Sequence, residues 1–167
     1  YNKISTLADL KYIDLPPFTH TMDGIIVGVV DATLAMMSAL VAAESCGLGT
    51  CCIGYARTAA PEAVSRLLEL PQGVFAVCGL AIGIPREKPD LKPKQPVSLI
   101  VHQNRYRNDD MGPELLDYDA EIREFNCTRS GATTDNDWAS HIIDYYRHAM
   151  SYHMLDALRR RGFDANS

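Results

Sequence analysis

Apolar residues are concentrated in one long segment of the chain, "IIVGVVDATLAMMSALVAA", and in several short ones. The long segment predicts a helix from Met22 to Ser45, which Thr21 can cap and which Gly47 and Gly49 end in a left-handed conformation. It is also long enough to span a membrane, but Asp31 lies within it, and an aspartate at the centre of a membrane helix costs about 3 kcal/mol. We therefore expect a buried central helix and no membrane.

The shorter apolar segments predict further helices and strands. Amphipathic patterns indicate helices in "PEAVSRLLEL", "PELLDYDAEIREF" and "WASHIIDYYRHAMSYHMLDALRRRG", the last as one or two helices. We expect "TCCIGY" to form a short buried strand or loop, and "GVFAVCGLAIGIP" and "VSLIVH" to form strands; the first of these two has apolar residues without alternation, as in a strand covered on both faces. Residues 1–20 read as helix or loop. The fold class is thus α+β, with a buried mixed sheet flanked by helices.

Composition is that of a globular protein with one domain: 167 residues, of which 47% are hydrophobic and 22% charged. The net charge of −5 argues against nucleic acid as the main partner, because neutralising phosphates requires a basic surface. Five cysteines without a regular spacing favour a reducing compartment, so we expect a cytoplasmic protein. The chain opens at Tyr1 with neither a methionine nor a signal peptide, and we expect its natural N-terminus to lie upstream.

The adjacent pair Cys51 and Cys52 could serve as metal ligands, as redox thiols or as packing residues. Two adjacent cysteines cannot comfortably ligate one metal, and the sequence has neither a C-x-x-C motif nor a histidine near them with ligand spacing. Packing is favoured for both, and contact with a ligand stays open for Cys52.

His148 and Tyr152 would share a helix face. Four histidines show no metal pattern, and we expect no metal site: His102, His141, His148 and His153.

A second candidate site is the basic stretch "DLKPK". Lys92 and Lys94 lie two residues apart, separated by Pro93, so an extended backbone would point both side chains the same way. Two ammonium groups that converge in this way suit a phosphate group. The alternative is a solvated, charged loop.

Several motifs in order resemble the FMN-dependent nitroreductase family. They are "GVVDATLAMMSALVAAESCGLGTCCIGYAR", "LLELPQGVFAVCGLAIGIPREKPDLKPKQP", "VHQNRY", "YDAEIREF", "TRSGATTDNDW" and "DALRRRGF". The branch they resemble is that of the oxygen-insensitive NADPH nitroreductases and flavin reductases. The resemblance implies a nitroreductase-like fold that forms an intertwined homodimer with flavin at the subunit interface. Family members also have an N-terminal segment with a basic His-Arg-Ser-type motif, which this sequence lacks. We therefore expect residues 1–167 to form a single, N-terminally incomplete domain.

By this resemblance, Cys52, Ile53, Gly54 and Tyr55 form a loop at the edge of the FMN ring. Gly54 would let the backbone approach the ring closely, and Ile53 can pack on it. Arg57, just beyond the loop, is a candidate for the NAD(P)H or substrate side. The catalytic residues are not identified by the sequence.

The resemblance also assigns the basic residues to phosphate groups. Lys92 and Lys94 would bind the FMN phosphate, although the second position is more often arginine in this branch. Arg129 lies where the family places an arginine for the 2′-phosphate of NADPH. The second basic position of that site is Thr134 here, and Ser151 replaces an arginine on the substrate side.

The implied reaction is a two-electron transfer from NADH or NADPH through FMN to a nitroaromatic, a quinone or free flavin. The partners would be a second copy of the chain and a small aromatic electron acceptor. One alternative is a non-catalytic flavin-binding or truncated interaction protein. A third interpretation, a cysteine-based redox or metal protein, is less favoured by the sequence.

Overall fold

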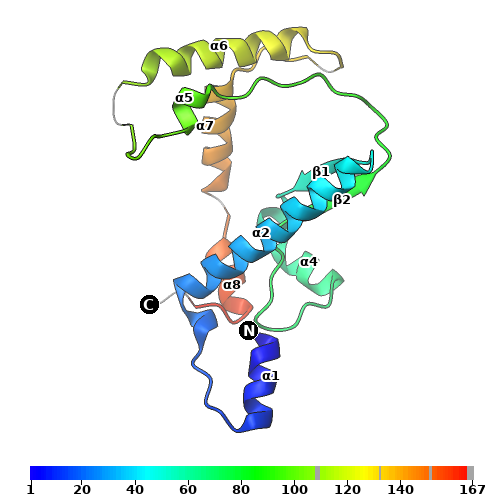
Figure 1. Cartoon of the computed structure of the whole chain (residues 1–167), viewed down its shortest axis with the longest axis vertical. Coiled ribbons are helices and arrows are strands. Elements are labelled where there is room, and N and C mark those ends of the chain that lie inside the picture. Colours follow the sequence, from blue (N-terminus) through cyan, green and yellow to red (C-terminus); the bar gives the residue numbers. More distant parts are fainter. Residues whose placement is uncertain (108–109, 132, 151, 165–167) are drawn as a thin grey trace. The chain divides into compact units, whose positions relative to one another are not determined.

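The chain divides into two compact units. The structure is a computed structural model, and it describes residues 1–107, 110–131, 133–150 and 152–164 (Figure 1). The first unit comprises Tyr1–Arg86 together with Tyr152–Ser167, and the second comprises Glu87–Ser151. Helices predominate in both, and the strands lie in the first, so the α+β class is confirmed.

The first unit is built from helices and one pair of strands. Its helix α2 contacts η1, β1 and β2, and α4 contacts α8. Phe75 and Phe163 meet edge to face in its interior, with ring centroids 5.0 Å apart. The elements are α1 (Asn2–Lys11), η1 (Phe18–His20), α2 (Met22–Ser45), β1 (Gly49–Ile53), α3 (Ala56–Ala59), α4 (Pro61–Leu67), β2 (Gly79–Gly83) and α8 (Met154–Arg160).

Helix α2 has the bounds that the sequence predicts. The Thr21 hydroxyl accepts a hydrogen bond from the Gly24 backbone N–H at 3.0 Å, which caps the helix. Gly24 also lies so close to η1 that an added Cβ would be 2.2 Å from the Phe18 carbonyl oxygen. At the other end Gly47 has φ 79°, which only glycine adopts without strain, whereas Gly49 lies in β1 and does not serve as a left-handed stop.

The expectation that α2 is buried is wrong for this chain taken alone. Ala43 is its buried residue, and large apolar side chains along the helix are exposed. By length and composition α2 would also suffice to cross a membrane, but its contacts with η1 and both strands make it part of the first unit. An apolar pattern shows that a surface needs cover, but it does not show which chain supplies the cover.

The sheet also differs from the expected buried, mixed one. Strands β1 and β2 pair antiparallel, with Cys51 opposite Ala81 and Cys52 opposite Leu80. Three of the five residues of each strand are exposed. Of the segment "GVFAVCGLAIGIP" only Gly79–Gly83 forms a strand. Both strands therefore have the apolar character of covered strands without being covered by the described part of this chain.

The second unit is helical. It contains α5 (Val97–Ile100), α6 (Gly112–Thr128) and α7 (Trp138–Ala149). Tyr118 and Ile122 are buried, the Tyr118 ring meets Trp138 at 5.5 Å, and burial raises the pKa of the Tyr118 hydroxyl. These contacts hold α6 and α7 together.

The predicted strand "VSLIVH" is wrong, because its first four residues form the single-turn helix α5. Pro96 precedes the turn and its carbonyl accepts the Leu99 N–H at 3.0 Å, while the Val97 carbonyl accepts the Val101 N–H at 2.8 Å. Ser98 hydrogen-bonds Glu114, which ties the turn to the start of α6. Local turn bonds, together with this contact to α6, thus outweigh the strand propensity of the β-branched residues.

Candidate functional site

The expected flavin loop lies at the end of β1, where the strand leaves the sheet. Cys52 and Ile53 are the last two residues of the strand, and Gly54 and Tyr55 continue into α3. Ile53 is 43% exposed and Tyr55 is 62% exposed, so the strand end presents apolar and aromatic surface. Such a surface can cover a flat ring, and Gly54 adds no side chain between the backbone and that ring.

Arg57 braces this loop from within the chain. Its Nη1 donates hydrogen bonds to the carbonyl oxygens of Gly54 at 3.2 Å and Val77 at 3.4 Å. A Cβ at Gly54 would lie 3.0 Å from the same Nη1, so the glycine leaves room for the guanidinium. Arg57 thus connects the loop to the segment before β2. Its assignment to the NAD(P)H or substrate side stays a prediction.

Tyr152 is a neighbour of the loop that sequence reasoning missed. Its ring meets that of Tyr55 edge to face, with centroids 6.3 Å apart. The expected shared helix face of His148 and Tyr152 is wrong, because α7 ends at Ala149 and Tyr152 lies outside the helices. The four-residue spacing suggested a helix, and nothing in the sequence indicates the contact with Tyr55.

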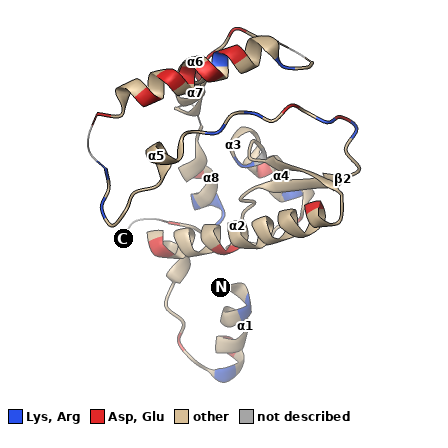
Figure 2. Cartoon of the chain, turned by 45° about the horizontal axis from the view of Figure 1, so that its top comes forward, with Lys and Arg blue, Asp and Glu red and all other residues tan. Residues whose placement is uncertain are grey.

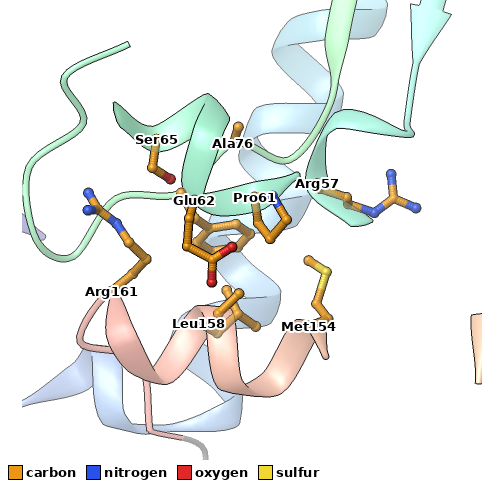
Figure 3. A pocket seen from close by; sticks show the side chains of 10 residues that line it. Arg57, Pro61, Glu62, Ser65, Ala76, Met154, Leu158 and Arg161 are labelled. Atoms are coloured by element: carbon orange, nitrogen blue, oxygen red, sulfur yellow. The ribbon is translucent and has the colours of Figure 1, made fainter. Parts of the chain in front are cut away.

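A small cavity lies between α4 and α8, and Arg57 is one of the residues that line it. Its volume is about 20 Å³, enough for roughly one water molecule. Figure 3 shows Pro61, Glu62, Met154 and Leu158 around it, while the Arg57 side chain extends away from them. Glu62 hydrogen-bonds Arg160, which lowers the pKa of its carboxyl. This cavity is a packing seam between two helices and is too small for a cofactor.

A larger hollow of about 270 Å³ lies beside the first turns of α2. Gly24, Val27, Gly28 and Asp31 contribute to it from the helix, and Phe163 from near the C-terminus. Its described lining is mainly apolar, with the Asp31 carboxylate and without a Lys or Arg side chain, so it does not suit a phosphate-bearing ligand.

In the second unit, the basic segment after β2 is extended. Residues 87–96 contain neither a helix nor a strand, and Lys92 and Lys94 are exposed within it. Figure 2 shows basic residues along the chain between β2 and α5. Both side chains are thus accessible to a ligand, and their convergence on one phosphate stays a prediction.

This segment is tied to the end of α6. The Ser130 backbone N–H donates a hydrogen bond of 2.6 Å to Oδ2 of Asp90. Hydrogen bonds from the Ser130 backbone and side chain lower the pKa of the Asp90 carboxyl. Sequence reasoning missed this contact, which joins residues 40 positions apart.

Arg129 and Thr134 lie in the loop that follows α6. Arg129 is the half-buried C-cap residue of the helix. The Thr134 N–H donates to the Asn126 carbonyl at 3.0 Å, and the Asn126 side chain donates to the Asn136 carbonyl at 2.7 Å. The loop is thus fixed onto α6. Ser151 lies outside the described residues.

The cysteines and histidines form neither a disulfide nor a metal cluster among the described residues. Cys51 and Cys52 are exposed, so the expectation that they are packing residues is wrong within this chain. Strand pairing with β2 does not by itself cover their side chains. All five cysteines are free thiols. Among the residues that the structure describes, no group of three His, Cys, Asp or Glu side chains could hold a metal ion.

The residues expected to bind FMN fall into two groups. The loop of residues 52–55 provides exposed apolar surface and a glycine, as a flavin ring requires. Residues 92–94 provide two exposed cations, as its phosphate requires. The assignment of each group to FMN stays a prediction, and the two groups lie in different units.

Comparison with known proteins identifies the family. The profile of the nitroreductase family matches residues 21–84, and that of the family's C-terminal domain matches residues 92–166. An FMN reductase (NAD(P)H) of Bacillus subtilis (strain 168) is 36% identical over 146 residues, which cover 87% of this chain and 58% of that protein. An oxygen-insensitive NADPH nitroreductase of Salmonella typhimurium is 42% identical over 118 residues, or 71% of this chain and 48% of that protein.

The structure agrees with the sequence comparison. The solved structure of B. megaterium NfrA2 superposes with a TM-score of 0.90 at 34% identity, over 99% of this chain and 66% of that one. The chain therefore spans between 48% and 66% of the length of these three proteins. Both the order of the matched segments and the fold lead to one conclusion: the chain belongs to the nitroreductase family.

Proposed function

We propose that the protein is an FMN-dependent NAD(P)H oxidoreductase, which passes two electrons from NADH or NADPH to nitroaromatics, quinones or flavins. The observation that carries this proposal is the exposed end of β1, residues 52–55, within the segment that matches the family profile. The names of the relatives, FMN reductase and NADPH nitroreductase, support the same reaction class.

In this proposal the chain binds and orients the cofactor. Ile53 and Tyr55 cover one edge of the ring, and Gly54 lets the backbone approach it. Lys92 and Lys94 bind the phosphate through charge-assisted hydrogen bonds. Bound FMN supplies the hydride chemistry between NAD(P)H and the acceptor, and the protein supplies position and electrostatics.

We further propose that the protein works as a cytoplasmic homodimer, with neither a membrane nor nucleic acid as a partner. The apolar surface of α2 supports the dimer, because one copy of the chain leaves it exposed. We also propose that both units belong to one nitroreductase-like domain, to which a further N-terminal segment contributes. That segment would supply the remaining basic residues around the FMN phosphate.

The phosphate contact gives a direct test. In the complete natural protein, changing Lys92 and Lys94 to alanine should weaken FMN binding about tenfold or more, because each charge-assisted contact is worth roughly 1.5–3 kcal/mol. Riboflavin has no phosphate, so its binding should change little. Lys88→Ala is the matched control, since Lys88 is an exposed lysine of the same segment.

Binding is measured by quenching of flavin fluorescence, and turnover by oxidation of NADH or NADPH with a quinone as acceptor. Equal losses for FMN and riboflavin would contradict the assignment of the two lysines. Retained flavin without NAD(P)H oxidation would contradict the enzymatic function.

A further inference from the structure

The contact between Asp90 and Ser130 links two segments that carry the proposed phosphate-binding cations. Asp90 lies two positions before Lys92 and four before Lys94, and Ser130 directly follows Arg129. The hydrogen bond from the Ser130 N–H to Oδ2 of Asp90 is 2.6 Å long. One carboxylate therefore joins the expected FMN-phosphate segment to the residue that follows the expected NADPH-phosphate arginine.

The two joined segments differ in how they are held. Residues 87–96 have no regular secondary structure, so their position depends on side-chain contacts. Arg129 and Ser130 directly follow the 17-residue helix α6, which is anchored by the buried Tyr118 and Ile122. Asp90 thus fastens an extended segment to a rigid helix end.

Charge alone does not explain a carboxylate at this position. A negative charge next to cations that bind phosphates repels those phosphates and weakens binding. The hydrogen bonds that it accepts from Ser130 act in the opposite direction if they fix the position of the lysines, because a fixed cation binds a phosphate more tightly. The two effects of Asp90 on phosphate binding have opposite signs, so an experiment can separate them.

We propose that Asp90 is a positioning residue, which holds the segment with Lys92 and Lys94 against the loop with Arg129 and thereby favours both phosphate-bearing ligands. The proposal rests on the proposed function, because it assumes that these cations bind FMN and NADPH. It adds a residue that contacts neither ligand but places the groups that do.

The test compares three single substitutions in the complete protein. Asp90→Ala removes the acceptor, and Asp90→Asn removes the charge but keeps an acceptor oxygen of the same reach. Glu87→Ala removes a negative charge from the same exposed segment and serves as the control. Two ratios are measured for each: the dissociation constant of riboflavin over that of FMN, and kcat/KM with NADPH over that with NADH.

A positioning role predicts that Asp90→Ala lowers both ratios, by roughly three- to fivefold for an exposed polar contact. Asp90→Asn should retain most of both ratios, and Glu87→Ala should leave them unchanged or slightly raised. If Asp90→Ala raises either ratio, Asp90 acts merely as a repulsive charge and the proposal is wrong. No change in either ratio would overturn it as well.

The experiment also separates this inference from the function on which it rests. If the unsubstituted protein does not prefer FMN to riboflavin, the proposed phosphate site itself fails. If it does prefer FMN and Asp90→Ala leaves the preference intact, only the positioning role fails. Circular dichroism of each variant shows whether the fold is retained.

Discussion

Replacing Arg161 by methionine should loosen the junction between α8 and the loop after α4. Arg161 follows the last residue of α8, and its guanidinium donates to three backbone carbonyls about 90 positions earlier in the chain. Nε reaches the Val74 oxygen at 3.1 Å, Nη2 reaches the Leu70 oxygen at 2.5 Å, and Nη2 also donates to Pro71. Methionine keeps an unbranched side chain but donates none of these bonds.

The expected loss follows from these three bonds. Arg161 is half-buried, so water can partly replace it, and each bond contributes about 0.5–1 kcal/mol net. The sum is roughly 2 kcal/mol of the free energy of unfolding, which corresponds to a fall in Tm of roughly 4–8 °C for a protein of this size. The backbone bond from the Gly73 N–H to the Arg161 carbonyl, 2.8 Å long, is unaffected by the substitution.

Arg159→Met provides the control for this prediction. Arg159 pairs with Asp156 at 4.0 Å and with Asp164 at 3.6 Å, and these exposed pairs are worth less than about 1 kcal/mol. Urea denaturation followed by far-UV circular dichroism, at one fixed flavin concentration, measures both variants. The reasoning is refuted if Arg161→Met and Arg159→Met lower the free energy of unfolding equally.

Two further predictions concern α7 and the coenzyme. The Ser140 N–H donates to Asp137 at 2.7 Å and lowers the pKa of that N-cap carboxyl, so the stabilisation by Asp137 is complete above the unfolded-state pKa and is lost as pH falls through the lower folded-state value. Urea denaturation should therefore show Asp137→Ala to be less stable than the unsubstituted protein near neutral pH, with the difference shrinking in acid; a constant difference would contradict the assignment. For the coenzyme, Arg129 has Thr134 rather than a second cation nearby in sequence, and Asp135 and Asp137 repel a phosphate. We expect kcat/KM for NADH and NADPH to agree within about tenfold, and Thr134→Arg to shift the ratio towards NADPH; a hundredfold preference of the unsubstituted protein for NADPH would show that another cation reads the phosphate.

Local signals in the sequence predicted helices α2, α4 and α6. The bounds of α2 follow from a capping threonine and a glycine with positive φ, both of which act within a few residues. The proline at the start of α4 and the apolar periodicity of α6 likewise act between residues that are close in the sequence. The strand predicted for "VSLIVH" is wrong because its residues form a turn that begins at Pro96, and Ser98 in this turn hydrogen-bonds Glu114 outside the segment.

Contacts between distant residues could not be predicted in this way. The carbonyls that accept from Arg161, the ring of Tyr152 beside Tyr55, and the bond between Asp90 and Ser130 have no local pattern. The motif order identified the family and the candidate flavin loop, while the residues that brace and position the site came only from the structure. Burial was the least predictable property, because it depends on surfaces that a single sequence does not contain.

The uncovered face of α2 affects how readily the protein aggregates while it is being synthesised. Val30, Leu34, Met37 and Val41 repeat at intervals of three and four residues, and each is between 47% and 63% exposed. A newly made chain therefore exposes a continuous apolar surface on α2 as soon as this helix forms. Such surfaces bind chaperones or associate with one another. The yield of soluble protein on expression should thus depend on how quickly that surface is covered. Slow synthesis at low temperature, or a polar substitution at Leu34, should change this yield, because covering competes with aggregation.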